Sequence, residues 1–513
     1  MLFNSMMFLL LFFPISLLIF YLLGRFQVNA AKFWLVVLSF LFYGWWNPKF
    51  LFLLIVSVIF NYIFGYFILT NLERPKITCF ILTMGIAGNL AVLFYYKYLM
   101  TLMDWFQKNG LYHGDAWGSV VLPLGISFFT FTQIGFLVDA KGGIVEEKGF
   151  LEYVLFVTFF PHLIAGPILH HREIMPQFAK KETYLLNWKN IGVGIGIFII
   201  GLTKKVLIAD RLAPWAAAVF AHPGESHQAE SWIGALSYSL QLYFDFSGYS
   251  EMALGIARTF NVLFPANFDS PYKSKNIIDY WQRWHISLTR YITLYLYNPV
   301  SLWIMRKRAA KGFALLRGEE TTFGGFFNML VVPTFYTMIL AGIWHGAGLQ
   351  FLIFGLLHGF YLCVNHAWRL FGPKKAFSNR WLSWIDIAWK VLLTYLSVLI
   401  AFIFFRAKTA SDAWLLIKSM LGMGMEKVGA ISAIGEGNKL IFLLGLFVFV
   451  LVMPNVLQLF EKEGASLTKI KSAPSLISLT WQPTAQWGFL FGVFVVLDLL
   501  FVNGTSVFLY FQF

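Results

Sequence analysis

Two histidines in apolar surroundings carry the most distinctive chemistry of this sequence. His345 follows Trp344 within the stretch 342–350, and thirteen residues later His358 precedes Gly359. A neutral imidazole can act as a general base on a hydroxyl, or it can itself accept an acyl group for a short time. In a membrane segment an ionisable side chain is costly, which makes each of these histidines a candidate functional residue.

The glycines around the two histidines offer a structural alternative. Each histidine directly precedes the second glycine of a Gly-x-x-x-Gly motif, at 342–346 and at 355–359. Such glycines let helix backbones pack closely, and a histidine there often only hydrogen-bonds the neighbouring helix. If 345–358 formed one straight helix, it would turn by about 220° and rise by about 20 Å. The two rings would then point apart, so we predict that at most one is catalytic. Trp344 and the Gly-Ala-Gly link favour His345.

A further polar group lies at 241–251, where Asp245 stands among phenylalanines and tyrosines. A buried Asp must be paired or neutralised. We therefore expect Asp245 to orient a basic group or to hold two helices together, and the second, structural role is favoured by residue type. Ser247 is a candidate N-cap for a helix whose first turn contains Glu251.

The least hydrophobic region, 259–326, contains an amphipathic segment at 280–288. Helical spacing places one set of its residues on one face and a second set on another: Trp281, Trp284, His285 and Leu288, against Arg283, Ser287 and Arg290. A basic stretch follows, with Arg306, Lys307, Arg308, Lys311 and Arg317. We expect a cytoplasmic loop there by the positive-inside rule, with attraction of a phosphate-bearing ligand as the less favoured interpretation.

Other motifs of catalysis or metal binding are weak. The sequence has no G-x-S-x-G, Walker or H-E-x-x-H motif. Cys79 and Cys363 lie in apolar surroundings, which indicates neither a disulfide framework nor a metal-binding cluster. The pair 170–171 reads as part of a solvated loop, and His222 and His227 lie in a polar stretch where no metal site is expected.

The composition of the chain indicates that membrane-spanning helices position these candidate residues. The 513-residue chain is 58% hydrophobic and only 12% charged, whereas a soluble domain carries roughly 25% charged residues. Apolar segments recur along the whole chain, which predicts an all-α polytopic membrane protein with about eleven crossings. The first segment, 6–24, reads as a retained helix rather than a signal peptide.

Prolines and glycines at 123–125, 160–161 and 166–167 predict broken helices. Broken backbone at membrane depth is tolerated where it is buried in protein or lines a cavity, so these breaks favour a site within the membrane. The net charge of +14 fits basic loops that face the cytoplasm and anionic lipid, and we expect no binding to nucleic acid.

Seven segments in order carry a resemblance to a known family. They are LPLGISFFTF at 122–131, FPHLIAGP at 160–167, KKVLIAD at 204–210, YFDFSGYS at 243–250, WQRWHISL at 281–288, WHGA at 344–347 and YFQF at 510–513. Together they resemble the membrane-bound O-acyltransferase superfamily, in the bacterial branch of alginate O-acetylase and of the peptidoglycan and cellulose acetylation proteins. The resemblance covers nearly the whole chain and implies a single integral-membrane domain, 1–513, with re-entrant or interfacial helices beside its transmembrane ones.

The resemblance also implies roles for particular residues. The catalytic histidine of the family lies in a Trp-His-Gly motif, which corresponds to His345, and its second polar position corresponds to His285. His358 then remains a packed helix histidine. The residues expected to bind substrate are those around these positions: Asp245, Ser247, Tyr249, Trp281, Arg283, Trp284 and Trp344. No metal is expected.

The activity implied is transfer of an acetyl group from cytoplasmic acetyl-CoA toward hydroxyls of an exported polysaccharide such as alginate, cellulose or peptidoglycan. The resemblance further implies a multi-pass protein of the bacterial inner membrane with a periplasmic SGNH/GDSL-type acetyltransferase as partner. D-alanyl transfer, other acyl transfer, a transporter and a purely structural scaffold are the alternatives.

One segment departs from the family pattern. Where relatives have Leu-Arg-Asp-Tyr-Leu-Tyr followed by a Gly-Gly turn, this chain has 292–299, with Thr293-Leu294 in place of Arg-Asp and Pro299 near the turn. This leaves the acceptor and any partner contact of that surface open, and it does not affect His345.

Overall fold

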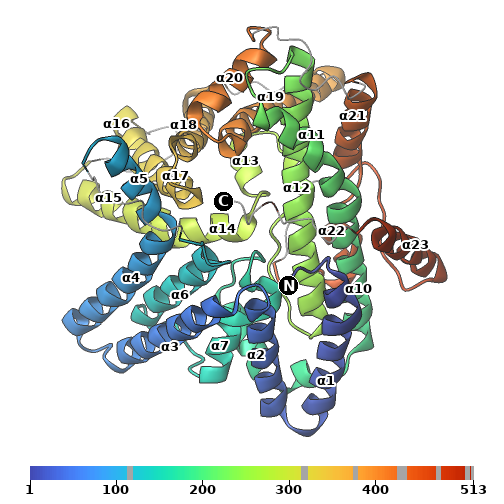
Figure 1. The fold of residues 1–513 in the computed structure, drawn as a ribbon. Coiled ribbons are helices and arrows are strands. Elements are labelled where there is room, and N and C mark those ends of the chain that lie inside the picture. The colour runs from blue at the N-terminus through green and yellow to red at the C-terminus, as the bar shows by residue number, and fades with distance from the viewer. Residues whose placement is uncertain are drawn as a thin grey trace.

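The computed structural model describes residues 1–111, 120–313, 322–373, 379–424, 436–468, 475–502 and Leu509. Within these residues the secondary structure consists of helices and contains no strand. The all-α class predicted from the sequence is confirmed. Figure 1 shows the helices arranged around a central region that holds the short helices α13 (Ile277–Trp281) and α14 (Ile286–Ile292).

The N-terminal part consists of helical hairpins at the lower edge of Figure 1. Its helices are η1 (Phe8–Phe12), α1 (Phe13–Phe26), α2 (Val28–Gly44), α3 (Pro48–Thr70), α4 (Pro75–Lys97) and α5 (Leu99–Lys108). Both α3 and α4 begin with a proline, which suits the first position of a helix because the missing N–H would have no partner there. The predicted first helix at 6–24 is present as η1 and α1.

The middle of the chain contains the predicted breaks. Its helices are α6 (Ile126–Lys141), α7 (Phe150–Thr158), α8 (Phe160–Leu163), α9 (His171–Ala179), η2 (Lys181–Tyr184), α10 (Trp188–Thr203), η3 (Lys204–Ala209), α11 (Asp210–Ala221) and α12 (Gln228–Thr259). Gly125 precedes α6 with φ +71°, and a Cβ there would lie 2.7 Å from the carbonyl oxygen of Leu163. Only glycine combines this backbone conformation with so close a contact.

The longest helix, α12, is buried along most of its length and packs against α10. Glycines of the two helices face each other, since a Cβ on Gly201 would lie 2.6 Å from the carbonyl oxygen of Gly248. Ser247 lies in the interior of α12, so its predicted role as an N-cap is wrong. The helix instead begins at Gln228, where the Glu230 carboxylate accepts a hydrogen bond of 3.0 Å from the His227 N–H.

In Figure 1 the C-terminal half runs from α15 and α16 at the left, through α13 and α14 at the centre and α19 and α20 at the top, to α21 and α23 at the right. After η4 (Pro271–Lys273), α13 and α14 come η5 (Thr293–Tyr297), α15 (Asn298–Ala310), α16 (Phe323–Phe326), η7 (Phe327–Val331), α17 (Val332–His345), α18 (Leu349–Phe371), α19 (Arg380–Arg406), α20 (Ala410–Met420), α21 (Glu436–Val452), α22 (Val456–Leu459), η8 (Glu461–Glu463) and α23 (Ala485–Phe501).

Two expectations for this half need correction. The segment 280–288 is not one helix, because α13 ends at Trp281 and α14 begins at Ile286. The basic stretch, expected as a loop, is helical up to Ala310, and Arg317 lies outside the described residues. The chain end at 510–513 also lies outside them.

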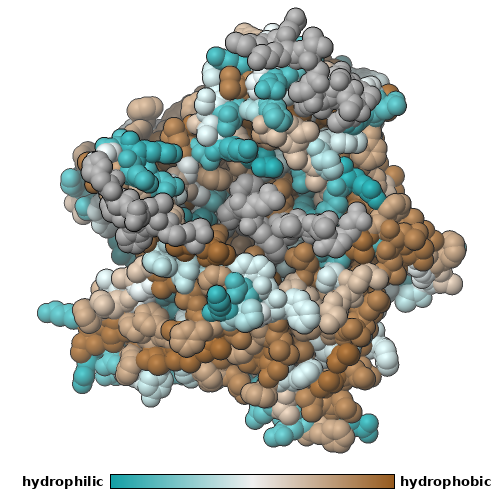
Figure 2. Space-filling model, viewed as in Figure 1, coloured by the Kyte–Doolittle hydropathy of each residue, from teal (hydrophilic) through white to brown (hydrophobic). Residues whose placement is uncertain are grey.

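Seven helices of the described part are long and apolar enough to cross a membrane: Phe8–Phe26, Pro48–Thr70, Pro75–Lys97, Trp188–Ala221, Phe323–His345, Leu349–Phe371 and Arg380–Arg406. Three shorter apolar helices, Val28–Gly44, Gly437–Val452 and Ala485–Phe501, accompany them. Figure 2 shows apolar residues gathered over the lower and right-hand parts of this face, around α1, α3, α4, α10 and α23. A multi-pass membrane protein is therefore confirmed, while the number of about eleven crossings stays a prediction.

Candidate active site

A small enclosed cavity brings together residues from distant parts of the chain. Its lining consists of Leu242 and Phe246 from α12, Trp281, Trp284, His285 and Leu288 from the α13–α14 region, His345 and Phe354 from the α17–α18 region, and Phe402 and Phe405 from α19. Its volume is about 20 Å³, which is room for roughly one water molecule. Two imidazoles thus share one aromatic chamber.

His345 reaches the cavity because the chain breaks directly after it. Helix α17 ends at His345 and α18 begins at Leu349, so the premise of one straight helix through 345–358 is wrong. The two helices pack against each other instead, and Gly342 and Gly355 lie at the contact, where a Cβ on Gly355 would collide with the carbonyl oxygen of Met338. The predicted role of the Gly-x-x-x-Gly motifs in close packing is confirmed.

Aromatic rings surround the His345 imidazole. Its centroid lies 4.8 Å from Phe405, 5.8 Å from Phe354 and 4.6 Å from Trp344, with interplanar angles of 77°, 87° and 60°. The side chain is buried, with 7% of its surface exposed. Ring edges and faces around a buried imidazole favour its neutral form, because water that would solvate an imidazolium is excluded.

The C-terminus of α4 holds the end of α17 in place. The Lys97 ammonium donates a hydrogen bond to the carbonyl oxygen of Trp344, and the Tyr98 hydroxyl donates one of 2.9 Å to that of Ile343. The Lys97 ammonium also lies 5.7 Å from the Trp344 ring centroid. A cation at the last carbonyls of a helix satisfies acceptors that have no partner within the helix. Lys97 and Tyr98 therefore fix the residue before His345 and, with it, His345 itself.

His285 occupies the break between α13 and α14 in the left-handed backbone region, with φ +43°. This conformation is unfavourable for a residue with a Cβ, so surrounding contacts must hold it. The ring packs edge-on against Phe246 at 4.7 Å, and Nδ1 lies 3.3 Å from Oδ1 of Asn267.

The contacts of Asn267 assign the proton of His285. The Asn267 amide donates to the Ser250 hydroxyl at 3.0 Å, and its Oδ1 accepts from the Ser287 hydroxyl at 2.6 Å. An oxygen in that position accepts, so Nδ1 of His285 carries the hydrogen and Nε2 is the basic nitrogen. Burial lowers the pKa of His285 to about 3, which keeps the imidazole neutral at neutral pH.

His358 lies behind the cavity wall. The Trp281 indole N–H donates a hydrogen bond of 3.2 Å to Nδ1 of His358, and the Phe354 ring contacts both His358 (4.6 Å) and His345 (5.8 Å). His358 is thus a packed helix histidine that fixes Trp281, and its ring is not distant from the site as a straight helix would require.

The remaining predicted site residues lie outside the cavity lining. Asp245 forms a buried ion pair of 2.6 Å with Lys205, and its Oδ2 accepts a hydrogen bond of 2.8 Å from the Leu509 N–H. The expectation that this Asp pairs with a basic group is confirmed. Tyr249 stacks on Phe3 at 4.7 Å. Arg283 forms ion pairs with Asp269 at 2.9 Å and with Asp279 at 2.7 Å.

Trp344 and Ser247 complete that set. Trp344 stacks on Phe131 at 5.2 Å with an interplanar angle of 22°, and Phe131 in turn stacks on Tyr291 at 5.0 Å. Ser247 is fully buried within α12. The structure therefore brings His285, His345, Trp281 and Trp284 together on the cavity, and it gives the other predicted residues contacts elsewhere in the core.

Sequence reasoning missed Lys97, Asn267 and Phe405. Lys97 ends an apolar segment, a position typical of any membrane helix, so its type gives no signal. Asn267 stands in an irregular stretch, and Phe405 is one of 57 phenylalanines. Only the folded arrangement sets them apart.

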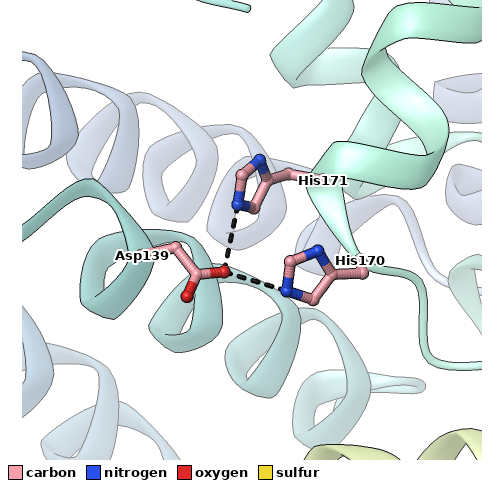
Figure 3. A group of neighbouring side chains, drawn as sticks. All are labelled: Asp139, His170 and His171. Atoms are coloured by element: carbon pink, nitrogen blue, oxygen red, sulfur yellow. Dashed lines mark hydrogen bonds and ion pairs between the residues drawn. The ribbon is translucent and has the colours of Figure 1, made fainter. Parts of the chain in front are cut away.

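The pair His170 and His171, expected in a solvated loop, is largely buried, and this expectation is wrong. Both Nε2 atoms lie 3.0 Å from Oδ2 of Asp139. Figure 3 shows both rings directed at this carboxylate. His171 has 3% of its surface exposed and is the first residue of α9.

Comparisons with known proteins show what this chain is similar to. The profile of the membrane-bound O-acyltransferase family matches residues 120–316. The chain is 34% identical to a peptidoglycan O-acetyltransferase of Helicobacter pylori, over 100% of this chain and 98% of that protein. It is 35% identical to a probable alginate O-acetylase of Azotobacter vinelandii, over 83% of this chain and 79% of that one. A teichoic acid D-alanyltransferase of Bacillus subtilis is 28% identical over 56% of this chain and 69% of its own length.

Proposed function

The chain belongs to the membrane-bound O-acyltransferase family and is a membrane acyltransferase, and from this premise we propose that it moves acetyl groups from acetyl-CoA toward hydroxyls of a cell-envelope polysaccharide. The observation that carries the proposal is the convergence of His285 and His345 on one enclosed aromatic cavity. These two residues come from segments 60 positions apart in the sequence, and each is held by several elements.

His345 is the general base in this proposal. Its neutral imidazole takes the proton of the acceptor hydroxyl while the hydroxyl oxygen attacks the thioester carbonyl carbon. The carbon–sulfur bond breaks, and the proton passes from His345 to the departing thiolate. The alternative, in which the imidazole first takes the acetyl group and then releases it to the hydroxyl, uses the same residue and the same cavity.

His285 is the second polar residue of the site. With the hydrogen on Nδ1 held by Asn267, its Nε2 is an acceptor for a substrate hydroxyl or a bound water. Trp281 and Trp284 form part of the wall beside it. We assign to this group the orientation of the acceptor, which contributes to catalysis by bringing the reacting atoms together.

The acetyl group is favoured over a D-alanyl group by the relatives, since the protein similar over the full length of this chain is a peptidoglycan O-acetyltransferase, whereas the teichoic acid D-alanyltransferase matches 56% of it. The described residues that line the cavity include no Asp or Glu to pair with the ammonium of a D-alanyl ester. Its aromatic rings and imidazole acceptors can still bind an ammonium, so donor competition is part of the test below.

The acceptor we favour is peptidoglycan, because the similarity to the Helicobacter pylori protein extends over the whole of both chains. The similarity to the probable alginate O-acetylase covers 83% of this chain. We place the protein in the inner membrane with the thioester on the cytoplasmic side. A periplasmic SGNH/GDSL-type acetyltransferase then completes delivery to the polymer.

Turnover of radiolabelled acetyl-CoA by the purified protein tests the proposal. The wild-type chain in detergent is compared with His345→Ala and His358→Ala, with short peptidoglycan fragments as acceptor. We expect His345→Ala to abolish turnover. His358→Ala removes the partner of the Trp281 indole, a hydrogen bond worth about 1 kcal/mol, and we expect a loss of up to about tenfold.

Three outcomes would reject the assignment. Equal turnover by the wild type and both variants would remove His345 from the chemistry. Flux of a polysaccharide precursor across vesicles that survives His345→Ala, without any acetyl-CoA turnover, would indicate a transporter. Transfer from a D-alanyl thioester at a higher rate than from acetyl-CoA would replace the acetyl donor.

A further inference from the structure

A second histidine group lies outside the proposed active site, where three parts of the chain meet. Asp139 stands near the end of α6, His170 and His171 lie at the start of α9, and Tyr295 belongs to η5. Figure 3 shows both imidazoles directed at the same carboxylate oxygen. The Tyr295 hydroxyl also reaches this oxygen, at 2.7 Å, and it lies 3.0 Å from Nε2 of His170.

Three polar groups converge on one carboxylate oxygen. The Tyr295 hydroxyl and the Nε2 atoms of His170 and His171 lie 2.7, 3.0 and 3.0 Å from Oδ2 of Asp139. Hydrogen bonds can satisfy this group, because the Tyr295 hydroxyl can donate to Asp139 and accept from His170. The same convergence of two imidazole nitrogens and a carboxylate oxygen also matches the ligand set of a single cation.

The spacing fits ligands of a single ion. Imidazole nitrogens and carboxylate oxygens bind Zn²⁺ at about 2.0–2.2 Å, so neighbouring ligand atoms lie roughly 3 to 3.5 Å apart. The ligand atoms of Asp139, His170 and His171 all lie within 4.8 Å of one another, and two of their separations are 3.0 Å. We propose that Asp139, His170 and His171 bind a divalent transition-metal ion, with Zn²⁺ as the favoured occupant and Tyr295 as the fourth donor.

The donor set selects the class of metal. Two imidazoles favour zinc and its transition-metal neighbours over Mg²⁺ and Ca²⁺, which prefer oxygen ligands. The rings are also fixed, since Phe136 packs edge-on against His171 at 5.7 Å.

The ion would connect the three elements that support the cavity from one side. Two turns before Asp139 on α6 lies Phe131, which stacks on Trp344, the neighbour of His345. One turn before Tyr295 lies Tyr291, and its ring stacks on the same Phe131 ring at 5.0 Å. A metal bound to Asp139 and Tyr295 would therefore fix the positions of Phe131 and Tyr291, the two rings that support Trp344. The role of such a metal is structural.

Metal analysis of the full-length protein tests the site. The chain is purified in detergent through a tag without histidine, dialysed against a chelator and given one equivalent of Zn²⁺. We expect it to retain about one ion per chain after desalting, by elemental analysis. Asp139→Asn and His171→Ala should each weaken Zn²⁺ binding by more than about 100-fold, measured by competition with a chromophoric chelator.

Two further variants distinguish loss of a metal ligand from loss of the local fold. His170→Cys keeps a zinc ligand, so it should bind the ion, and Co²⁺ in its place should show a sulfur-to-metal charge-transfer band that the wild type lacks. Glu173→Gln serves as the matched control on α9: it breaks the ion pair of Glu173 with Arg290 and should leave metal binding unchanged.

The proposal is overturned if the wild type binds Zn²⁺ no more tightly than Asp139→Asn does, or if Co²⁺ in His170→Cys shows no sulfur ligation. Because the readout is bound metal, these outcomes are independent of acetyl-CoA turnover.

Discussion

The molecule holds histidine pairs in two contrasting environments. In the cavity, His285 and His345 lie among phenylalanine and tryptophan rings, and the described lining has no carboxylate. At the end of α6, His170 and His171 face one carboxylate oxygen of Asp139. Both pairs are largely buried, so burial alone does not distinguish them.

The difference shows how neighbours decide what an imidazole can do. Aromatic walls exclude water and offer no counter-charge, so the imidazole stays neutral and its lone pair is available to a substrate proton. A carboxylate at 3.0 Å instead orients the ring and supplies negative charge, which suits a cation or a structural ion pair. The same residue type is thus suited to base catalysis in one place and to ligation in the other.

The largest effect should come from the cavity pair. His345→Ala removes the proposed base, and general base catalysis contributes about 10²–10⁴-fold, so acetyl-CoA turnover should fall at least that far. His285→Ala should lower turnover less, because it removes an orienting group and leaves the base. Steady-state turnover of both variants, with circular dichroism to confirm helical content, measures this. A larger loss in His285→Ala than in His345→Ala would reverse the two roles.

Asn267→Asp introduces a carboxylate beside His285, so that the cavity site resembles the group in which Asp139 faces His170 and His171. A carboxylate next to Nδ1 stabilises the imidazolium and should raise the pKa of His285 by about 1–3 units from its value of about 3. Protonated His285 cannot accept a hydrogen bond from substrate, so turnover should fall as the pH drops from about 6 to about 4.

The control for this substitution is Asn267→Ala, which removes the hydrogen bond without adding charge. It should lower turnover by a similar factor at every pH. Identical pH profiles for Asn267→Asp, Asn267→Ala and the wild type would show that the charge state of His285 does not matter to the reaction.

Lys97→Met should lower turnover by an intermediate amount, smaller than the loss in His345→Ala, and it should leave the Asp139 group unchanged. It leaves the Trp344 carbonyl without its ammonium donor, and an unsatisfied buried acceptor costs about 1–3 kcal/mol. We expect turnover to fall roughly tenfold, with Lys97→Arg restoring much of it because a cation returns to the end of α17. Unchanged turnover in Lys97→Met would mean that His345 keeps its position without this anchor.

The smallest effect should come from Glu173→Gln beside the Asp139 group. The Glu173 and Arg290 side chains are joined by contacts of 2.6 and 2.8 Å but are about a quarter to a third exposed. Partly exposed ion pairs contribute at most about 1 kcal/mol, so the midpoint of thermal unfolding in detergent should shift by about 1 °C or less for a chain of 513 residues, and turnover should change little. A large loss of activity would couple this side of the molecule to catalysis more tightly than the structure suggests.

The helical fold could be predicted from local pattern, and the main contributors to the cavity from local pattern together with the family resemblance. Hydropathy indicates the helices, and helical spacing placed Trp281, Trp284, His285 and Leu288 on one face, whereas the site roles of His345 and His285 came from the resemblance to the family motifs. Trp281, Trp284, His285 and Leu288 do share a cavity, although the helix predicted to align them is broken at His285. Their assignment as catalytic or substrate-binding residues stays a prediction.

Contacts between distant segments could not be predicted in this way. His170 and His171 were expected in solvent because their neighbours in sequence are polar, while their partner Asp139 lies 31 residues earlier and Tyr295 lies 125 residues later than His170. The geometry of His345 and His358 was also missed, since 346–348 ends one helix and lets the next pack back against it. Local periodicity carries no information on either arrangement.

Acetyl-CoA turnover and bound zinc, measured on the same preparations of His345→Ala and His170→Ala, test the central claim most directly. The claim is that the two histidine groups do different work. We predict that His345→Ala loses turnover and keeps its metal, and that His170→Ala loses its metal and keeps measurable turnover. Full turnover in His345→Ala, or loss of the same property in both variants, would contradict it.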